Sequence, residues 1–102
     1  MKVVDIADEL HKELGEPSTL SVPAITYWLR SNIGSLSNYL NEGFTLNSTS
    51  LDIEKTVNDE KVQIDEDEKD VLKKMYHIHY YDILLRSTLS AAGTDSVVEI
   101  QS

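Results

Sequence analysis

Residues 65–92 read as one long helix, and this helix constrains how the rest of the chain can fold. It begins with a capping box, in which Asp65 accepts from the backbone of the first turn and Glu68 reaches back to the backbone of Asp65. Gly93 is predicted to end it. Apolar residues recur along it in steps of three and four, namely Val71, Met75, Ile78, Leu85, Leu89 and Ala92. This period predicts a helix that buries one broad face.

One charged residue interrupts the apolar stripe. Asp82 occupies the position between Ile78 and Leu85. A buried carboxylate without a partner is strongly destabilising, and Arg86 lies one turn later at the spacing of an ion pair. We therefore expect a structural ion pair between Asp82 and Arg86, or between Asp82 and an arginine from another segment.

Two shorter helices are predicted before the long one. The spacing of Val3, Ile6 and Leu10 gives the first its apolar face, and the second begins at a Ser21 cap with Pro23 tolerated in its first turn. The predicted fold is mainly α, a small bundle of three main helices in a single domain with a loop or β-hairpin insertion and an extended C-terminal tail. The helices are expected at about 2–14, 22–42 and 66–92, the loop or hairpin at 44–64, and the tail at 94–102.

The segment between the second and third helices loses the helical period. Its apolar residues alternate at Phe44 and Leu46 and again at Leu51 and Ile53, around an Asn-Ser-Thr-Ser turn. A loop or hairpin of this length in a small domain is often functional, so this segment is predicted to contact a partner.

Acidic residues outnumber basic ones by eighteen to nine, which gives a formal net charge of −9. Residues 44–70 carry nine acidic and three basic side chains, whereas residues 71–102 carry three of each. Such a surface repels phosphates, so we do not expect specific binding of nucleic acid. An acidic run is typical of a solvated face, and it also fits the wall of a channel through which DNA slides.

The composition limits the cellular setting. The chain has no cysteine, which excludes a disulfide framework and a thiolate nucleophile. It has no apolar run of about 20 residues that could span a bilayer, and its first ten residues lack the apolar core of a signal peptide. We expect a protein made in the cytoplasm that does not contact a membrane.

The sequence carries no catalytic or phosphate-binding motif, and we predict a non-enzymatic protein without a cofactor or metal. His77 and His79 are two residues apart, so on a helix they point away from one another and cannot readily bind one ion. His79 and Asp82 have the spacing of a pair, and an enzyme that uses both remains an alternative if a pocket places them near a further polar group.

The order of the elements, the ITYWLRSNIGSLSNYLN pattern of the second helix and the LLRSTLSAAG end of the Tyr-rich long helix resemble the head–tail connector proteins of tailed bacteriophages. In that family, also called adaptor or head-completion proteins, small helical subunits form a ring, usually of twelve, beneath the portal. The resemblance implies a structural protein of the virion neck, through which DNA passes without specific binding. The extended segment at 44–64 departs from the commonest members.

The resemblance implies contacts with neighbouring subunits, with the portal protein and with the next neck or tail protein. The candidate ring contacts are Tyr27, Arg30, Asn38, Tyr80 and Tyr81. The candidate docking residues are Phe44, Leu46, Val97, Val98 and Ile100. The last three are apolar residues of a short tail that would be buried by adding as a strand to a neighbour.

A function of a different class remains open. The chain could be a small acidic regulatory protein that binds a host or viral protein, for example as a mimic of DNA. Acidic side chains spaced along one face like phosphates would favour the mimic. Acidic residues that converge on a ring axis would favour the connector.

Overall fold

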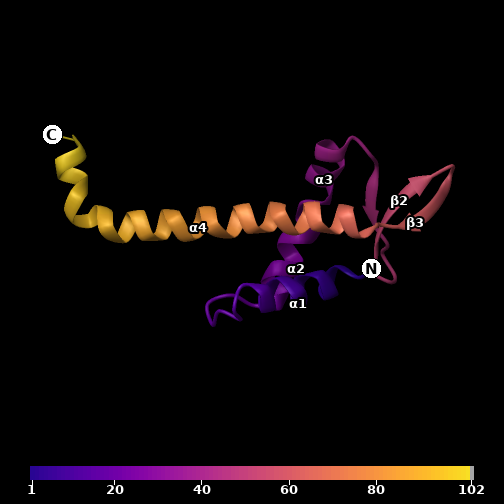
Figure 1. Ribbon diagram of the computed structural model, residues 1–102, viewed down its shortest axis with the longest axis horizontal. Coiled ribbons are helices and arrows are strands. Elements are labelled where there is room, and N and C mark those ends of the chain that lie inside the picture. Colours follow the sequence, from indigo (N-terminus) through magenta and orange to yellow (C-terminus); the bar gives the residue numbers. More distant parts are fainter. Residues whose placement is uncertain (102) are drawn as a thin grey trace.

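The computed structural model describes the backbone of residues 1–101 and the side chains of residues 1–90. The fold is mainly α, with four helices and a small antiparallel sheet of three strands (Figure 1). The elements follow the order α1 (Val3–Glu13), α2 (Val22–Ser31), α3 (Ile33–Leu40), β1 (Phe44–Leu46), β2 (Ile53–Val57), β3 (Glu60–Gln63) and α4 (Glu66–Gln101).

The molecule is elongated, with extents of 59, 28 and 21 Å. Helix α4 runs along the longest axis, and α1, α2 and α3 lie around its first part (Figure 1). The β2–β3 hairpin points away from the helices at one end of this axis, and α4 extends toward the other end (Figure 1). The body formed by α1–α3 and the sheet therefore covers only one portion of the long helix.

The predicted helix starts are confirmed. The Ser21 hydroxyl accepts from the Ala24 amide at 3.2 Å, with Pro23 in the first turn of α2. At the start of α4, the Glu68 amide donates to Asp65 Oδ1 at 2.8 Å and the Asp65 amide donates to Glu68 Oε1 at 2.9 Å. This reciprocal pair is the predicted capping box.

The single helix predicted at 22–42 is wrong, because the chain forms two helices that break at Asn32. The Asn32 side-chain amide donates to the Trp28 carbonyl at 2.8 Å, and the Ser31 hydroxyl donates to the Tyr27 carbonyl at 2.9 Å. Side chains that bond to helix carbonyls in this way compete with the backbone ladder. In Figure 1, α2 lies below α4 and α3 lies above it, on either side of the break.

The predicted loop or hairpin is a three-stranded sheet in the order β1-β2-β3. Phe44 pairs with Lys55 between the first two strands, and Val57 pairs with Glu60 across the second turn. Asn58 and Asp59 form this turn at φ values of 53° and 65°, as a two-residue hairpin of the primed type requires. The sequence did not predict β3, because all four of its residues are exposed and show no alternation.

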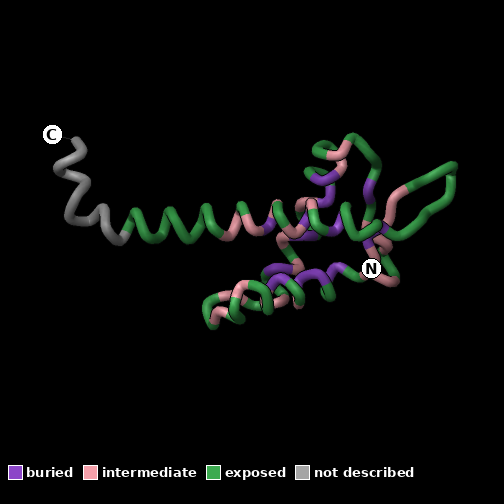
Figure 2. Tube along the Cα trace, in the orientation of Figure 1, coloured by how far each residue is buried: buried purple, intermediate pink, exposed green. Residues whose placement is uncertain are grey.

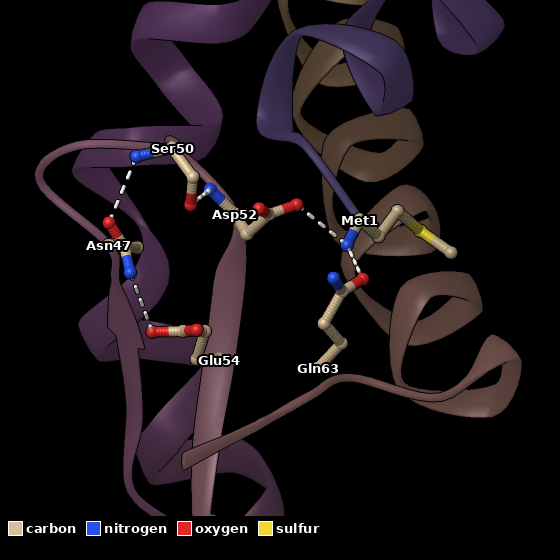
Figure 3. Close-up of polar contacts among 6 residues, drawn as sticks. All are labelled: Met1, Asn47, Ser50, Asp52, Glu54 and Gln63. Carbon is tan, nitrogen blue, oxygen red and sulfur yellow. Dashed lines mark hydrogen bonds and ion pairs between the residues drawn. The ribbon is translucent and has the colours of Figure 1, made fainter.

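Polar contacts hold the first turn of the sheet and the start of the chain together (Figure 3). Asn47 Oδ1 accepts from the amides of Thr49 and Ser50 at 2.8 and 2.9 Å. The Met1 ammonium lies 2.8 Å from Asp52 Oδ1 and also donates to Gln63 Oε1. The bond from this ammonium is the main cause that lowers the pKa of the Asp52 carboxyl.

The core lies where α1, α2 and the first turns of α4 meet, and the burial decreases sharply along α4 (Figure 2). Helix α1 contributes its predicted apolar face, and β1 and β2 close one end. The buried apolar side chains are Val3, Ile6, Ala7, Leu10, Ile25, Leu29, Ile33, Leu36, Phe44, Ile53, Ile64, Leu72 and Tyr76.

The predicted end of the long helix at Gly93 is wrong, as is the extended tail at 94–102, because α4 continues to Gln101. Glycine within a helix costs only about 1 kcal/mol relative to alanine, so the flanking residues can carry the helix past it. The side chains of Val97, Val98 and Ile100, the predicted docking residues of the tail, lie outside the described side chains. Among the helices that the structure describes, none is long and apolar enough to cross a membrane.

Candidate functional site

The first part of α4, residues 66–76, is fixed to the body by ion pairs around buried apolar side chains. Lys55 from β2 donates to Glu68 Oε2 at 2.9 Å. Lys69 lies 2.9 Å from Glu66 and 3.4 Å from Glu9 of α1. The bonds to Glu68 and Glu66 raise the pKa of Lys55 and Lys69 respectively. We call residues 66–76 the proximal part of α4.

An aromatic cluster continues this anchoring by one turn. The Trp28 ring meets Tyr76 edge to face at a centroid distance of 5.3 Å and stacks on His79 at 4.9 Å. Tyr80 lies 6.5 Å from Tyr76. Burial raises the pKa of the Tyr76 hydroxyl, with a smaller contribution from Tyr80. Aromatic pairs of this kind contribute about 0.5–1.5 kcal/mol beyond the area they bury, so Trp28 fixes the position where α4 leaves the body.

The remainder of the described helix, residues 77–90, contains no buried residue. We call it the distal part of α4. Ile78, Leu85 and Leu89 are 72%, 57% and 60% exposed, although the apolar period predicted them on a buried face. That prediction is wrong because the body ends near Trp28 and does not reach them. These three residues and the exposed Tyr81 lie at helical spacing, and we call them the outer stripe.

A groove of about 430 Å³ lies between the distal part of α4 and the turn that connects α1 to α2. We call it the Leu20 groove, because Leu20 forms its wall opposite α4. His11 Nε2 lies 3.1 Å from the Leu20 carbonyl oxygen and 3.4 Å from that of Pro17, which ties this wall to α1. The groove is lined by Thr19, Leu20, Tyr76, Tyr80, Ile83, Leu84 and Ser87.

The Leu20 groove and the outer stripe lie on different sides of the same helix. Ser87 of the groove and Leu89 of the stripe are two residues apart, and a helix rotates by about 200° over two residues. Together the two surfaces make the distal part apolar over most of its circumference. Helices with this pattern are normally buried. The apolar period of the sequence identified Ile78, Leu85 and Leu89 of the outer stripe. It did not indicate the groove, because the wall at Thr19 and Leu20 comes from a turn with no local signal.

The ion pair between Asp82 and Arg86 forms, with Arg86 Nε 2.9 Å from Asp82 Oδ2. It is not the buried pair that was expected, because the two side chains are 50% and 79% exposed. Exposed pairs four residues apart on a helix contribute about 0.3–0.5 kcal/mol. Asp82 and Arg86 are also the only charged residues in the sequence of the distal part, which therefore has no net charge at neutral pH.

The predicted ring contacts fall on two surfaces. Tyr27 and Arg30 of α2 line a shallow hollow of about 330 Å³ together with Ser31 and Leu46. Asn38 is exposed on α3 and does not line this hollow.

The other two predicted ring contacts, Tyr80 and Tyr81, lie on the distal part of α4 with their rings edge to face at 5.3 Å. Phe44 was predicted to dock a partner and is instead a core residue with only 5% of its surface exposed. It faces inward because its strand closes one end of the body, so its apolar character reflects the fold.

The histidines and carboxylates that could have held a metal are used otherwise. His79 stacks on Trp28, and Asp82 pairs with Arg86. Among the residues that the structure describes, no group of three or more histidine, aspartate or glutamate side chains is placed to hold a metal ion.

The chain matches none of the protein-family models, curated proteins or solved structures with which it was compared. The distal part of α4 is therefore defined as a candidate site by its own geometry. It combines a groove, a stripe of exposed apolar side chains and an absence of net charge, and this combination fits a surface that another protein chain covers.

Proposed function

We propose that the protein is a non-enzymatic structural protein that assembles into a ring in the neck of a bacteriophage virion, between portal and tail. The observation that carries the proposal is the distal part of α4, where apolar side chains on more than one side of a helix have no cover from the body. Exposed apolar patches of this kind mark surfaces that contact another protein.

The division of the molecule supports an assembly role. The proximal part of α4 and the body supply a folded unit with its own core, while the distal part projects from it (Figure 2). A subunit of this form can place its projecting helix against a neighbour without unfolding. The net charge of −9 belongs mostly to the other parts of the chain and would let DNA pass a ring of such subunits without adhering.

The regulatory alternative, including the mimic of DNA, has less support. Several acidic side chains that could imitate phosphates face lysines within the fold. Glu13 lies 2.7 Å from Lys73, and Glu68 lies 2.9 Å from Lys55. Carboxylates neutralised in this way do not present a regular row of free negative charge.

The test is the mass of the purified protein, measured by native mass spectrometry or light scattering, alone and after mixing with portal or neck material. A large closed ring, alone or in the mixture, is the expected result. The Leu85→Glu variant should lose the ring, whereas Val57→Glu should keep it, because Val57 is a similarly exposed apolar residue on the hairpin at the other end.

A wild-type chain that remains a monomer or dimer in every mixture would contradict the connector. If that chain also bound a purified nucleic-acid-binding protein in competition with DNA, the regulatory function would replace it.

A further inference from the structure

We infer that the Leu20 groove of one copy holds the outer stripe of the next copy, so that subunits join head to tail through two different faces of the distal part of α4. This inference rests on the proposed function and identifies the contact that closes the ring. The occupant of the groove is a second copy of this chain, and the contact is heterologous.

The first argument is geometric. The groove is concave and lined by Tyr80, Ile83 and Leu84, whereas the stripe is a convex row of Ile78, Tyr81, Leu85 and Leu89. Each copy carries both, on different sides of one helix. An interface that pairs two different patches generates a ring when the rotation closes, whereas a patch that pairs with itself stops at a dimer.

The second argument is electrostatic. Two copies of a chain with a net charge of −9 repel one another over most of their surfaces. The distal part of α4 has one acidic and one basic residue, so two copies can approach there at a low electrostatic cost. A basic partner protein would be attracted instead to the acidic residues 44–70. The neutral apolar surface of the distal part therefore favours another copy of the chain as the occupant of the groove.

Leu84 and Leu85 offer a matched pair of variants. They are neighbours in sequence with similar exposures of 48% and 57%, but Leu84 lines the groove and Leu85 belongs to the stripe. Leu84→Glu leaves a copy with an intact stripe and a blocked groove, and Leu85→Glu leaves the reverse. Neither residue is buried, so both variants should retain the far-ultraviolet circular dichroism of the wild type.

The experiment is native mass spectrometry of each variant alone and of their equimolar mixture. Each variant alone should be a monomer, and the mixture should contain a heterodimer and nothing larger, since one intact groove meets one intact stripe. A Leu84→Glu variant that forms homodimers would overturn the inference in favour of stripe-to-stripe pairing. Monomers only in the mixture, while the wild type forms rings, would overturn the groove contact but leave the connector function standing.

Disulfide cross-linking can detect association that is too weak for native mass spectrometry. Because the chain has no native cysteine, only the introduced cysteines can react. Ser87→Cys in the groove and Leu89→Cys in the stripe should form a mixed disulfide when combined under oxidising conditions, in preference to either homodimer. Glu60→Cys on β3 is the control and should not enter the mixed product. Equal yields of all disulfides would show random collision and overturn the inference. Failure of the wild type to associate under any condition would overturn the proposed function together with it.

Discussion

The proximal and distal parts of α4 belong to one continuous helix and both carry apolar residues at helical spacing, yet they have different surroundings. Leu72 in the proximal part is fully buried and is surrounded by ion pairs to α1 and β2. Leu85 in the distal part is more than half exposed. Apolar periodicity therefore shows which residues of a helix need cover, but the length of the body decides which of them obtain it within the monomer.

The largest expected difference concerns local opening. Amides of residues 69–76 should exchange with solvent only on global unfolding, whereas amides of residues 82–90 should exchange by local unfolding, because few contacts hold that part of the helix. With a global stability of roughly 5 kcal/mol, the protection factors should differ by roughly three orders of magnitude in the monomer. Hydrogen exchange measured by mass spectrometry checks this. Equal protection in a chain shown to be monomeric would mean that the distal part is covered by something within the monomer.

Matched leucine truncations give the next largest effect. Leu72→Ala should lower the free energy of unfolding by about 2–5 kcal/mol, as is usual for a fully buried leucine. Leu85→Ala should change it by less than about 0.5 kcal/mol, as surface substitutions do. Urea denaturation at a concentration where the protein is monomeric provides both values. A similar loss in the two variants would contradict the difference between the two parts of α4.

Two aspartates provide a smaller comparison. Asp65→Ala removes the acceptor that caps α4 at 2.8 Å and should cost about 1 kcal/mol. Asp82→Ala removes an exposed ion pair four residues apart and should cost no more than about 0.5 kcal/mol. The same denaturation assay applies, and added salt should reduce the second effect further. A larger cost for Asp82 would indicate that its carboxylate has a structural role beyond the pair.

The smallest effect is a loss of stability at alkaline pH that arises from the proximal part of α4 and from Lys55 of β2, which pairs with it. The pKa values of Lys55, Lys69 and Tyr76 are all raised in the folded chain. A group whose pKa is raised by folding stabilises the folded chain at any pH below the pKa that this group has in the unfolded chain. That stabilisation is lost as the pH rises through the pKa of the group in the folded chain. The urea midpoint should therefore fall above about pH 10. In Tyr76→Phe the fall should be shallower, and an identical profile would remove Tyr76 from the explanation.

Local signals made parts of this structure predictable from the sequence. The capping box, the Ser21 cap and the Phe44–Leu46 alternation each depend on residues close together in the chain, and α4, α2 and β1 begin where these signals indicate. The break at Asn32 was missed because it results from a competition between side-chain and backbone hydrogen bonds. Pattern alone does not indicate which of the two is formed.

The candidate site was predictable only in part. The apolar spacing identified Ile78, Leu85 and Leu89, but their exposure depends on the distance that α1 and α2 extend along α4. The groove depends on Leu20, which His11 holds in place across nine residues. Contacts of this kind appear only when the elements are assembled in three dimensions.

The β2–β3 hairpin offers a way to determine how the subunits are oriented in an assembly. Its two-residue turn, Asn58–Asp59, lies at the far end of the long axis from the distal part of α4. Exposed tips of this kind tolerate short insertions, since no core side chain depends on them. In the proposed ring, a peptide epitope placed there and decorated with an antibody fragment would add density to one rim. Electron micrographs would then show on which rim the hairpins lie.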